Sequence, residues 1–304
     1  MRKELILIAP LLLLWGCGQD PAEAPDEAAS TVGVTSEFEW VSQGTEAGAS
    51  TVTRTGDGKI IVESFTHWNN REYTVNSELQ LNADGIPVAQ RITGISPFGA
   101  PIDETFSYVD GVASWSTAGE SGSVTTDDPG FYVATEGGAL GMTAFVQAAL
   151  KNMDGEIAVL PSGTARVEKL VSTDVDTPAG SETLSLYAIS GLGFTPVYGW
   201  FNDDIELTVL DFGGYMGMYP KGWSQDVLAK LSAIQIEQDA LMVESIAGRL
   251  AYVQNSPLVF DNVDIVDVEN GALLEDHFVM VEGGKITAIS SAQIDVEGAR
   301  HIEV

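Results

Sequence analysis

The chain has 304 residues, 44% of them hydrophobic, which is long enough for about two domains and apolar enough for a sizeable core. Its formal net charge of −30 at pH 7 excludes nucleic acid as a partner, because the phosphates would be repelled. The same charge excludes a hold on anionic lipid by charge alone, and it predicts a well-solvated surface.

Residues 1–17 have the pattern of a secretory signal. Arg2 and Lys3 provide a positive start, and residues 5–14 form an apolar run that is too short to cross a membrane. The segment ends in LWGC, which resembles the signal of bacterial lipoproteins. That resemblance implies that Cys17 becomes the new N-terminus and carries a lipid. A plain signal peptide is the alternative.

Cys17 is the single cysteine of the chain, which excludes an intramolecular disulfide. Gly18 and Gln19 follow it, so the chain lacks the aspartate that marks lipoproteins for the inner membrane. We therefore expect a protein of the bacterial cell envelope, anchored by lipid on Cys17 in the outer membrane and facing the periplasm.

Residues 18–37 have the composition of a disordered acidic tether. They are rich in alanine, proline, aspartate and glutamate and carry no sustained apolar period. Such a segment cannot bury enough surface to offset the entropy lost on ordering. A flexible tether of this kind would hold the folded part off the membrane.

Residues 38–223 are predicted to form an antiparallel β-domain. Turn signals recur at short intervals, and between them lie β-rich runs, several of which alternate apolar and polar residues as half-buried strands do. The runs include 59–63, 73–79, 184–189 and 205–209. Short strands at this spacing favour a mainly β fold, with a curved antiparallel sheet or open barrel, over alternating β-α units.

Two helices interrupt or follow this sheet. Residues 139–151 are apolar on nearly all sides, which predicts a helix buried against the sheet. Residues 224–250 are predicted to contain a long connecting helix from about Gln225 to Gly248, with Ser224 as the N-cap and Gly248 as the stop. The arrangement resembles the curved-sheet domains of bacterial periplasmic lipoproteins and lipoprotein carriers, which implies an apolar cavity between sheet and helix.

Aromatic and methionine side chains concentrate between residues 194 and 223. They suit a ligand pocket, but they also suit the half-buried faces of an ordinary β-core, and the core is the interpretation that we favour. These residues are Phe194, Tyr198, Trp200, Phe201, Phe212, Tyr215, Met216, Met218, Tyr219 and Trp223.

Isolated polar residues give weaker signals. His67 is better explained as a loop histidine than as a catalytic one. The pairs Asp127-Asp128 and Asp203-Asp204 have oxygen ligands that suit calcium, but turn chemistry explains them better, because neither lies in a spaced acidic loop. We therefore assign no catalytic, cofactor-binding or metal-binding residue.

Residues 256–304 contain two hairpin signals. An apolar run at 263–268 closes at Asn270-Gly271, and two further runs are joined by Gly283-Gly284. The order of these pieces, ending in VMVEGGKITAI at 279–289, resembles the start of the amidohydrolase family. The resemblance implies a partial β-sandwich at 256–304, followed in a full-length parent by a (β/α)8 barrel with divalent metal, zinc above all.

The chain does not contain the catalytic part that the resemblance implies. Its three histidines are His67, His277 and His301, and none belongs to the His-x-His pair that supplies the family's first metal ligands. A (β/α)8 barrel needs about 250 residues beyond this point. We therefore expect this chain to bind no cofactor and to depend on a missing C-terminal barrel of the same polypeptide.

Two functions stay open at this level. In the first, the chain is the non-catalytic N-terminal part of an envelope-anchored amidohydrolase-like enzyme that hydrolyses amide or cyclic amide C–N bonds. In the alternative, it is a non-enzymatic periplasmic lipoprotein that binds an apolar ligand or partner through its curved sheet.

Overall fold

The computed structural model describes residues 33–136, 141–251 and 253–303. The predicted signal peptide, Cys17 and most of the predicted tether lie outside these ranges. The described chain forms two compact units, one that ends at Gln235 and one that begins at Ile236. No described helix is both long and apolar enough to cross a membrane.

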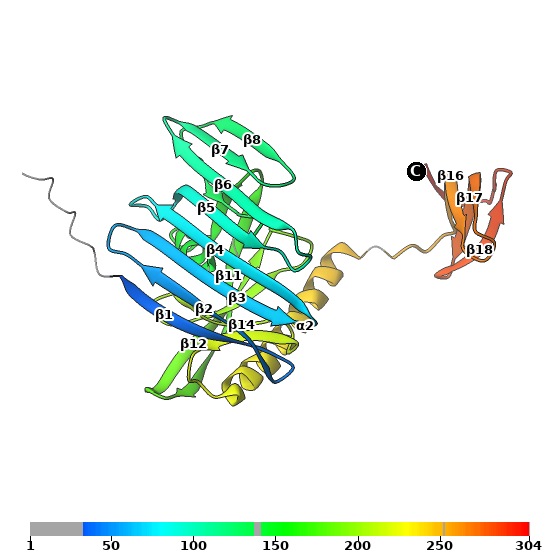
Figure 1. The fold of residues 1–304 in the computed structure, drawn as a ribbon. Helices are drawn as coiled ribbons and strands as arrows, with labels where there is room; N and C mark the ends of the chain where they lie inside the picture. Colours follow the sequence, from blue (N-terminus) through cyan, green and yellow to red (C-terminus); the bar gives the residue numbers. More distant parts are fainter. Residues whose placement is uncertain (1–32, 137–140, 252, 304) are drawn as a thin grey trace, which may run out of the picture. The chain divides into compact units, whose positions relative to one another are not determined.

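The first unit is built on one large sheet (Figure 1). In the described chain its strand order is β8-β7-β6-β5-β4-β3-β2-β1-β15-β14-β13-β12-β11-β10-β9, antiparallel throughout except between β9 and β10. The predicted mainly β fold with a curved antiparallel sheet is confirmed. The strands are β1 Val34–Ser42, β2 Thr45–Arg54, β3 Lys59–Trp68, β4 Arg71–Leu81, β5 Pro87–Ile95, β6 Pro101–Val109, β7 Val112–Ser116, β8 Ser121–Thr125, β9 Phe131–Tyr132, β10 Glu156–Leu160, β11 Thr164–Thr177, β12 Gly180–Ser190, β13 Val197–Phe201, β14 Leu207–Asp211 and β15 Met216–Pro220.

Strand β1 begins earlier than the sequence predicts. Residues 34–37 pair with residues 51–54 of β2, so the predicted tether 18–37 is wrong at its C-terminal end. This stretch is polar and mostly exposed, and composition alone therefore assigns it to the tether. A strand can carry polar side chains when its backbone is paired and one face lies in solvent.

The sheet rolls up around helix α1 (Met142–Ala149). Its buried side chains, including Phe145 and Val146, share one core with residues from β1–β4 and from β10–β15. In Figure 1, β1–β8 form the near layer, and β11, β12 and β14 lie behind them. The predicted buried helix is confirmed, but it ends before residue 151, because Asn152 and Asp154 favour a turn.

Irregular pairing bends the sheet. The register shifts between Trp40 and Val41 of β1, and similar shifts occur in β11 and β13. A β-bulge of this kind bends the strand and increases its twist. Opposite Trp40, Gly48 has a φ of +148°, and a Cβ atom there would lie 2.0 Å from the carbonyl oxygen of Phe65. Only glycine therefore fits at this bend.

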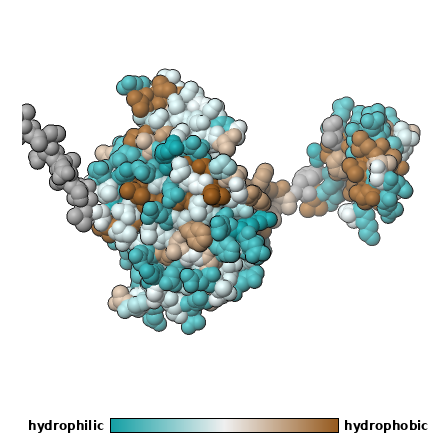
Figure 2. Space-filling view, in the orientation of Figure 1, coloured by the Kyte–Doolittle hydropathy of each residue, from teal (hydrophilic) through white to brown (hydrophobic). Residues whose placement is uncertain are grey.

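The outer face of β1–β8 lies in solvent. Figure 2 shows this side of the first unit as mostly hydrophilic, with scattered apolar residues. Adjacent strands carry exposed ion pairs there, such as Arg91 with Asp103 at 3.2 Å. Exposed pairs of this kind contribute at most about 1 kcal/mol each, so they favour solvation more than stability.

Helix α2 (Gln225–Leu250) covers part of the opposite outer face with its first half. Val227 and Leu231 pack against outward residues of β12, including Leu184 and Leu186. Strand β12 is therefore buried on both faces. The predicted N-cap is confirmed, since the Ser224 hydroxyl accepts the amide of Asp226 at 3.1 Å, but the helix continues past the predicted stop at Gly248.

A buried carboxylate joins the two ends of the roll. Glu104 of β6 is 2% exposed, and it accepts hydrogen bonds from the Tyr132 hydroxyl (2.7 Å) and from the backbone amides of Thr135 and Glu136 (3.0 Å each). The ring of Tyr132 also stacks on Phe106, with centroids 4.4 Å apart. The segment after β9 is thereby held against β6, although no described backbone ladder pairs β9 with that strand.

The second unit contains one four-stranded sheet in its described residues. The order is β18-β17-β16-β19, with bounds β16 Leu258–Asp267, β17 Ala272–Glu282, β18 Lys285–Ser290 and β19 Arg300–Glu303. Both predicted hairpins are present, with turns at Asn270-Gly271 and Gly283-Gly284. Among the apolar residues described in this unit, only Val259 is fully buried, so the unit has little core of its own.

We predict that Glu104→Gln lowers the free energy of unfolding by about 1–3 kcal/mol, the cost of leaving buried donors unpaired. One carboxylate oxygen serves two donors and the other serves the Glu136 amide, so the new NH2 group would face an N–H donor. Urea denaturation followed by tryptophan fluorescence measures the change. The exposed Glu168→Gln on β11 is the control and should stay within about 0.5 kcal/mol of the wild type. Equal effects of the two variants would contradict the structural role of Glu104.

Candidate ligand pocket

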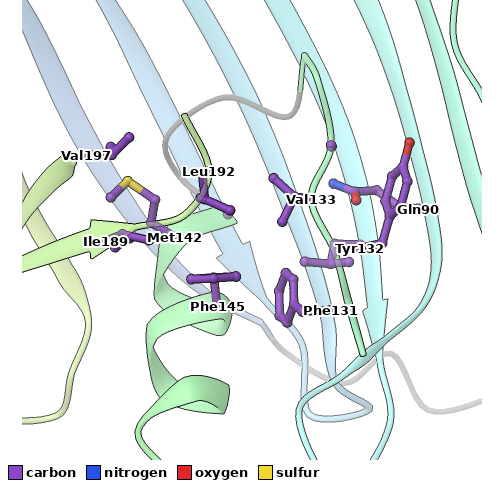
Figure 3. Close-up of a pocket in the computed structure, with 12 residues that line it drawn as sticks. Gln90, Phe131, Tyr132, Val133, Met142, Phe145, Ile189, Leu192 and Val197 are labelled. Atoms are coloured by element: carbon purple, nitrogen blue, oxygen red, sulfur yellow. The ribbon is translucent and has the colours of Figure 1, made fainter. Parts of the chain in front are cut away.

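A small recess lies beside α1 (Figure 3). Met142 and Phe145 of the helix face Phe131 and Leu192 across it, and Phe131 meets Phe145 edge to face with centroids 5.0 Å apart. Its volume is about 100 Å³. A cavity of roughly 150 Å³ is needed to hold benzene, so this recess is a gap in the packing more than a binding site.

A larger recess, which we call the tryptophan pocket, lies elsewhere on the inner face of the roll. It is partly enclosed and has a volume of about 250 Å³. Its walls are almost entirely apolar, and none of its lining residues carries a charge. The lining residues are Trp40, Val62, Ser64, Thr66, Trp68, Tyr73, Val75, Pro97, Phe212 and Met216.

The floor of this pocket comes from strand periodicity. Every second residue of β3 points inward, which places Ser64, Thr66 and Trp68 on one face. On β4, Tyr73 pairs with Thr66 and Val75 pairs with Ser64. Gly48 of β2 pairs with Thr66 on the other side and adds no side chain.

The rim comes from the turn between β14 and β15. Asp211 is buried, and its carboxylate accepts the Gly214 amide at 3.0 Å, while Gln235 of α2 donates to its backbone carbonyl at 2.8 Å. Burial raises the pKa of the Asp211 carboxyl, and the hydrogen bonds oppose that rise. The turn presents Phe212, whose ring is nearly parallel to that of Trp40 with centroids 6.4 Å apart.

The rim is tied to the hairpin between β3 and β4. Asn69 lies in that hairpin turn with a φ of +51°, and its Nδ2 donates to the Tyr215 hydroxyl at 2.8 Å. The backbone amide of Gln43 donates to the Tyr215 carbonyl at 3.0 Å. Three chain segments that are far apart in sequence are therefore joined at the mouth of the pocket.

The pocket is apolar but contains hydroxyl groups. Trp40 Nε1 donates to Ser50 Oγ at 2.7 Å, and Ser50 Oγ donates in turn to Ser64 Oγ at 2.7 Å. Thr66 is 2% exposed, and its hydroxyl has no hydrogen-bond partner among the described residues. Burial, with the negative charge and hydrogen bond of Glu136, raises the pKa of the Tyr73 phenol to about 12, so this lining residue is neutral.

The aromatic cluster predicted from sequence divides between two roles. Four of its members are buried in the core, the role that the sequence analysis favours: Trp200, Phe201, Met218 and Tyr219. Two others, Phe212 and Met216, line the pocket. Phe194 is 110% exposed and belongs to neither. Sequence reasoning missed Trp40, Thr66, Trp68 and Tyr73, which lie more than a hundred residues earlier. The alternation of β3 identifies its inward face, but not which strands face it across the roll.

The weaker polar candidates lie at turns and strand ends. His67 is exposed and lies in β3, just before the hairpin turn, so the predicted loop position is wrong. Asp128 caps the Gly130 amide at 3.1 Å, which is turn chemistry. His301 contacts Asp261 at 3.0 Å. Among the described residues, no group of three or more histidine, cysteine, aspartate and glutamate side chains is placed to hold a metal ion.

Comparisons with known proteins give one structural similarity. No protein-family profile matches the chain, and no curated protein matches it. A similar solved structure is the β-barrel-like protein of a domain of unknown function, DUF1849, from Brucella abortus. The two are 8% identical with a TM-score of 0.42, and the match covers 63% of this chain and 97% of that one. A similarity of this size carries no inference about function.

The predicted membership of the amidohydrolase family is wrong. The family comparison finds no match, and the structural comparison leads to a β-barrel-like protein of unknown function instead. The hairpins at 256–304 are real, but any two short β-rich runs joined by a glycine turn produce them. The motif therefore identifies local structure and not a family, and the hydrolase activity that it implied loses its basis.

We predict that Thr66→Val raises the free energy of unfolding by about 1 kcal/mol, because valine has the same shape and removes a buried hydroxyl without a partner. Thr143 of α1 is the matched control. It is also 2% exposed, but it accepts the Leu207 amide at 2.9 Å. Thr143→Val should therefore lower the same quantity by about 1–3 kcal/mol. Urea denaturation of both variants tests the pair, and a loss of stability in Thr66→Val would show that its hydroxyl is satisfied.

Proposed function

We propose that the protein is a non-enzymatic binding protein that holds a small apolar molecule in the tryptophan pocket. The observation that carries the proposal is the pocket itself, an uncharged recess of about 250 Å³ inside the roll. Ligand sites are concave, mostly apolar, lined by aromatic side chains and equipped with a few polar groups. Trp40, Trp68, Phe212 and the Ser64 and Thr66 hydroxyls meet that description.

The volume limits the size of the ligand. A cavity of roughly 150 Å³ holds benzene, which has six carbon atoms. By proportion, the tryptophan pocket holds a molecule of about ten non-hydrogen atoms. This size excludes a whole phospholipid and favours a compact ring system or a short chain.

The charge of the protein supports a neutral ligand. The chain carries 44 acidic residues against 14 basic ones, and no basic residue lines the pocket. An anion would approach a repulsive field and would lose its hydration without gaining a cationic partner. A neutral molecule is not repelled by the negative charge, and it loses less hydration on entering the pocket.

A location in the cell envelope would suit the same function. We propose that Cys17 carries lipid and that the first unit faces the periplasm, since the LWGC segment and the acidic stretch after it suit a tethered binding protein. In that compartment, a membrane-anchored protein with an apolar pocket would take up small hydrophobic molecules between the membranes.

We predict that the full chain binds naphthalene, which has ten carbon atoms, and that Met216→Trp weakens binding by about tenfold or more, equivalent to at least 1.4 kcal/mol. Met216 lines the pocket, and the larger indole would fill it. Equilibrium dialysis with naphthalene fluorescence as the readout gives both affinities.

Met153→Trp is the matched control for this experiment. Met153 is 108% exposed and lies outside the pocket, so the same substitution there should leave naphthalene affinity unchanged. Thermal melting of both variants checks that each is folded. Equal affinities of wild type and Met216→Trp would place the binding elsewhere.

We predict that Cys17→Ser releases the protein from the membrane fraction into the soluble periplasmic fraction of a Gram-negative host, because serine cannot carry the thioether lipid. Wild-type protein should sediment with the membranes. Sedimentation after cell lysis, followed by detection of an affinity tag at the C-terminus, measures the change. Soluble wild-type protein would argue for a plain signal peptide instead.

A further inference from the structure

The tryptophan pocket contains a specificity element for the ligand. We infer that Thr66, with Ser64 as a second donor, hydrogen-bonds an acceptor oxygen of the ligand. The ligand class is then a neutral ketone or ester with a compact apolar body. This inference rests on the proposed function and adds the chemical group that the pocket recognises.

Trp40, Ser50 and Ser64 form a chain of hydrogen bonds, which we call the serine relay, and Trp40 sets its direction. An indole N–H donates and cannot accept, so Ser50 Oγ accepts the proton of Trp40 Nε1 at 2.7 Å. Ser50 then donates to Ser64 Oγ at 2.7 Å. The hydroxyl proton of Ser64 is left to donate onward, and no acceptor for it is found among the described residues. The relay therefore presents a donor at the pocket wall.

Thr66 supplies the second observation. It lines the same pocket, two residues further along β3, and its buried hydroxyl has no partner in the described chain. Buried polar groups are nearly always paired, and an unpaired one in a folded protein calls for an explanation. A ligand oxygen in the pocket would pair it. Alternate residues of a strand point to the same face, so Ser64 and Thr66 lie next to each other along the floor of the pocket.

The neighbours of these hydroxyls favour an uncharged acceptor. Val62, Val75 and Met216 add apolar atoms to the wall, and no lining residue offers a positive charge to a carboxylate. A carbonyl oxygen accepts one or two hydrogen bonds without carrying a full charge. It therefore fits a pocket whose polar groups are hydroxyl donors in an apolar wall.

The test compares two molecules of the same shape. Propiophenone and 2-phenyl-1-butene each have about ten non-hydrogen atoms, the number that the pocket volume allows, and they differ only in a carbonyl against a methylene group. The quantity of interest is the Kd of the hydrocarbon divided by the Kd of the ketone. This ratio cancels most differences in pocket shape between variants. Isothermal titration calorimetry on the full chain gives both constants.

We expect the ratio to be about tenfold higher in the wild type than in Thr66→Val, which corresponds to one hydrogen bond of about 1.4 kcal/mol. Thr66→Ser retains a hydroxyl and should keep most of the wild-type ratio. Ser64→Ala should lower the ratio in the same direction as Thr66→Val, and it provides a second variant at a half-buried position.

The outcomes separate this inference from the proposed function. If both molecules bind the wild type, and Thr66→Val and Ser64→Ala each keep the wild-type ratio, the inference is overturned and apolar binding stands. If neither molecule binds the wild type, the proposed function fails and the inference fails with it. A ratio that falls in Thr66→Val but not in Thr66→Ser supports both.

Discussion

The carboxylate of Glu104 is the contact on which the rolled sheet depends. A sheet of this length has an apolar inner face that must be covered, yet no described backbone ladder pairs β8 with β9. Glu104 closes the roll instead. It accepts hydrogen bonds from one hydroxyl and two backbone amides in the segment at and after β9. A buried carboxylate without hydrogen-bond donors is costly. Only an arrangement that brings these donors to Glu104 avoids that cost, so the carboxylate favours this closure over other packings of the segment. The Phe106–Tyr132 stack adds apolar contact at the same place.

Closure of the roll explains why the pocket exists. Helix α1 fills one part of the interior, where Phe145 and Val146 meet both halves of the sheet. The part between Trp40, Thr66 and Phe212 is lined by no residue of that helix. Aromatic rings line that part without filling it, and the hydroxyls of Ser64 and Thr66 lie in its floor. The pocket is thus the remainder of a core that one short helix cannot fill.

The local structure was largely predictable, and the family was not. The β-runs at 59–63 and 73–79 lie within β3 and β4, and the buried helix, the N-cap at Ser224 and the hairpins at 256–304 are all present. These features depend on neighbours within a few residues, which the sequence displays directly. The amidohydrolase interpretation failed because it extended a hairpin pattern, which is local, to a whole architecture. The tether boundary failed because the pairing of residues 34–37 depends on β2 and not on their own composition.

The sequence by itself determined several of the strands, their alternation, the two helices and the acidic composition, because each follows from short-range periodicity or from composition. Only the tertiary structure decided that the sheet rolls, that Glu104 closes it and that Trp40, Thr66, Tyr73 and Phe212 meet in one pocket. Strand order and curvature come from bulges and from packing on α1, and these bring together residues separated by well over a hundred positions. No pattern within a single segment carries that information, since the contacts form between the two halves of the roll.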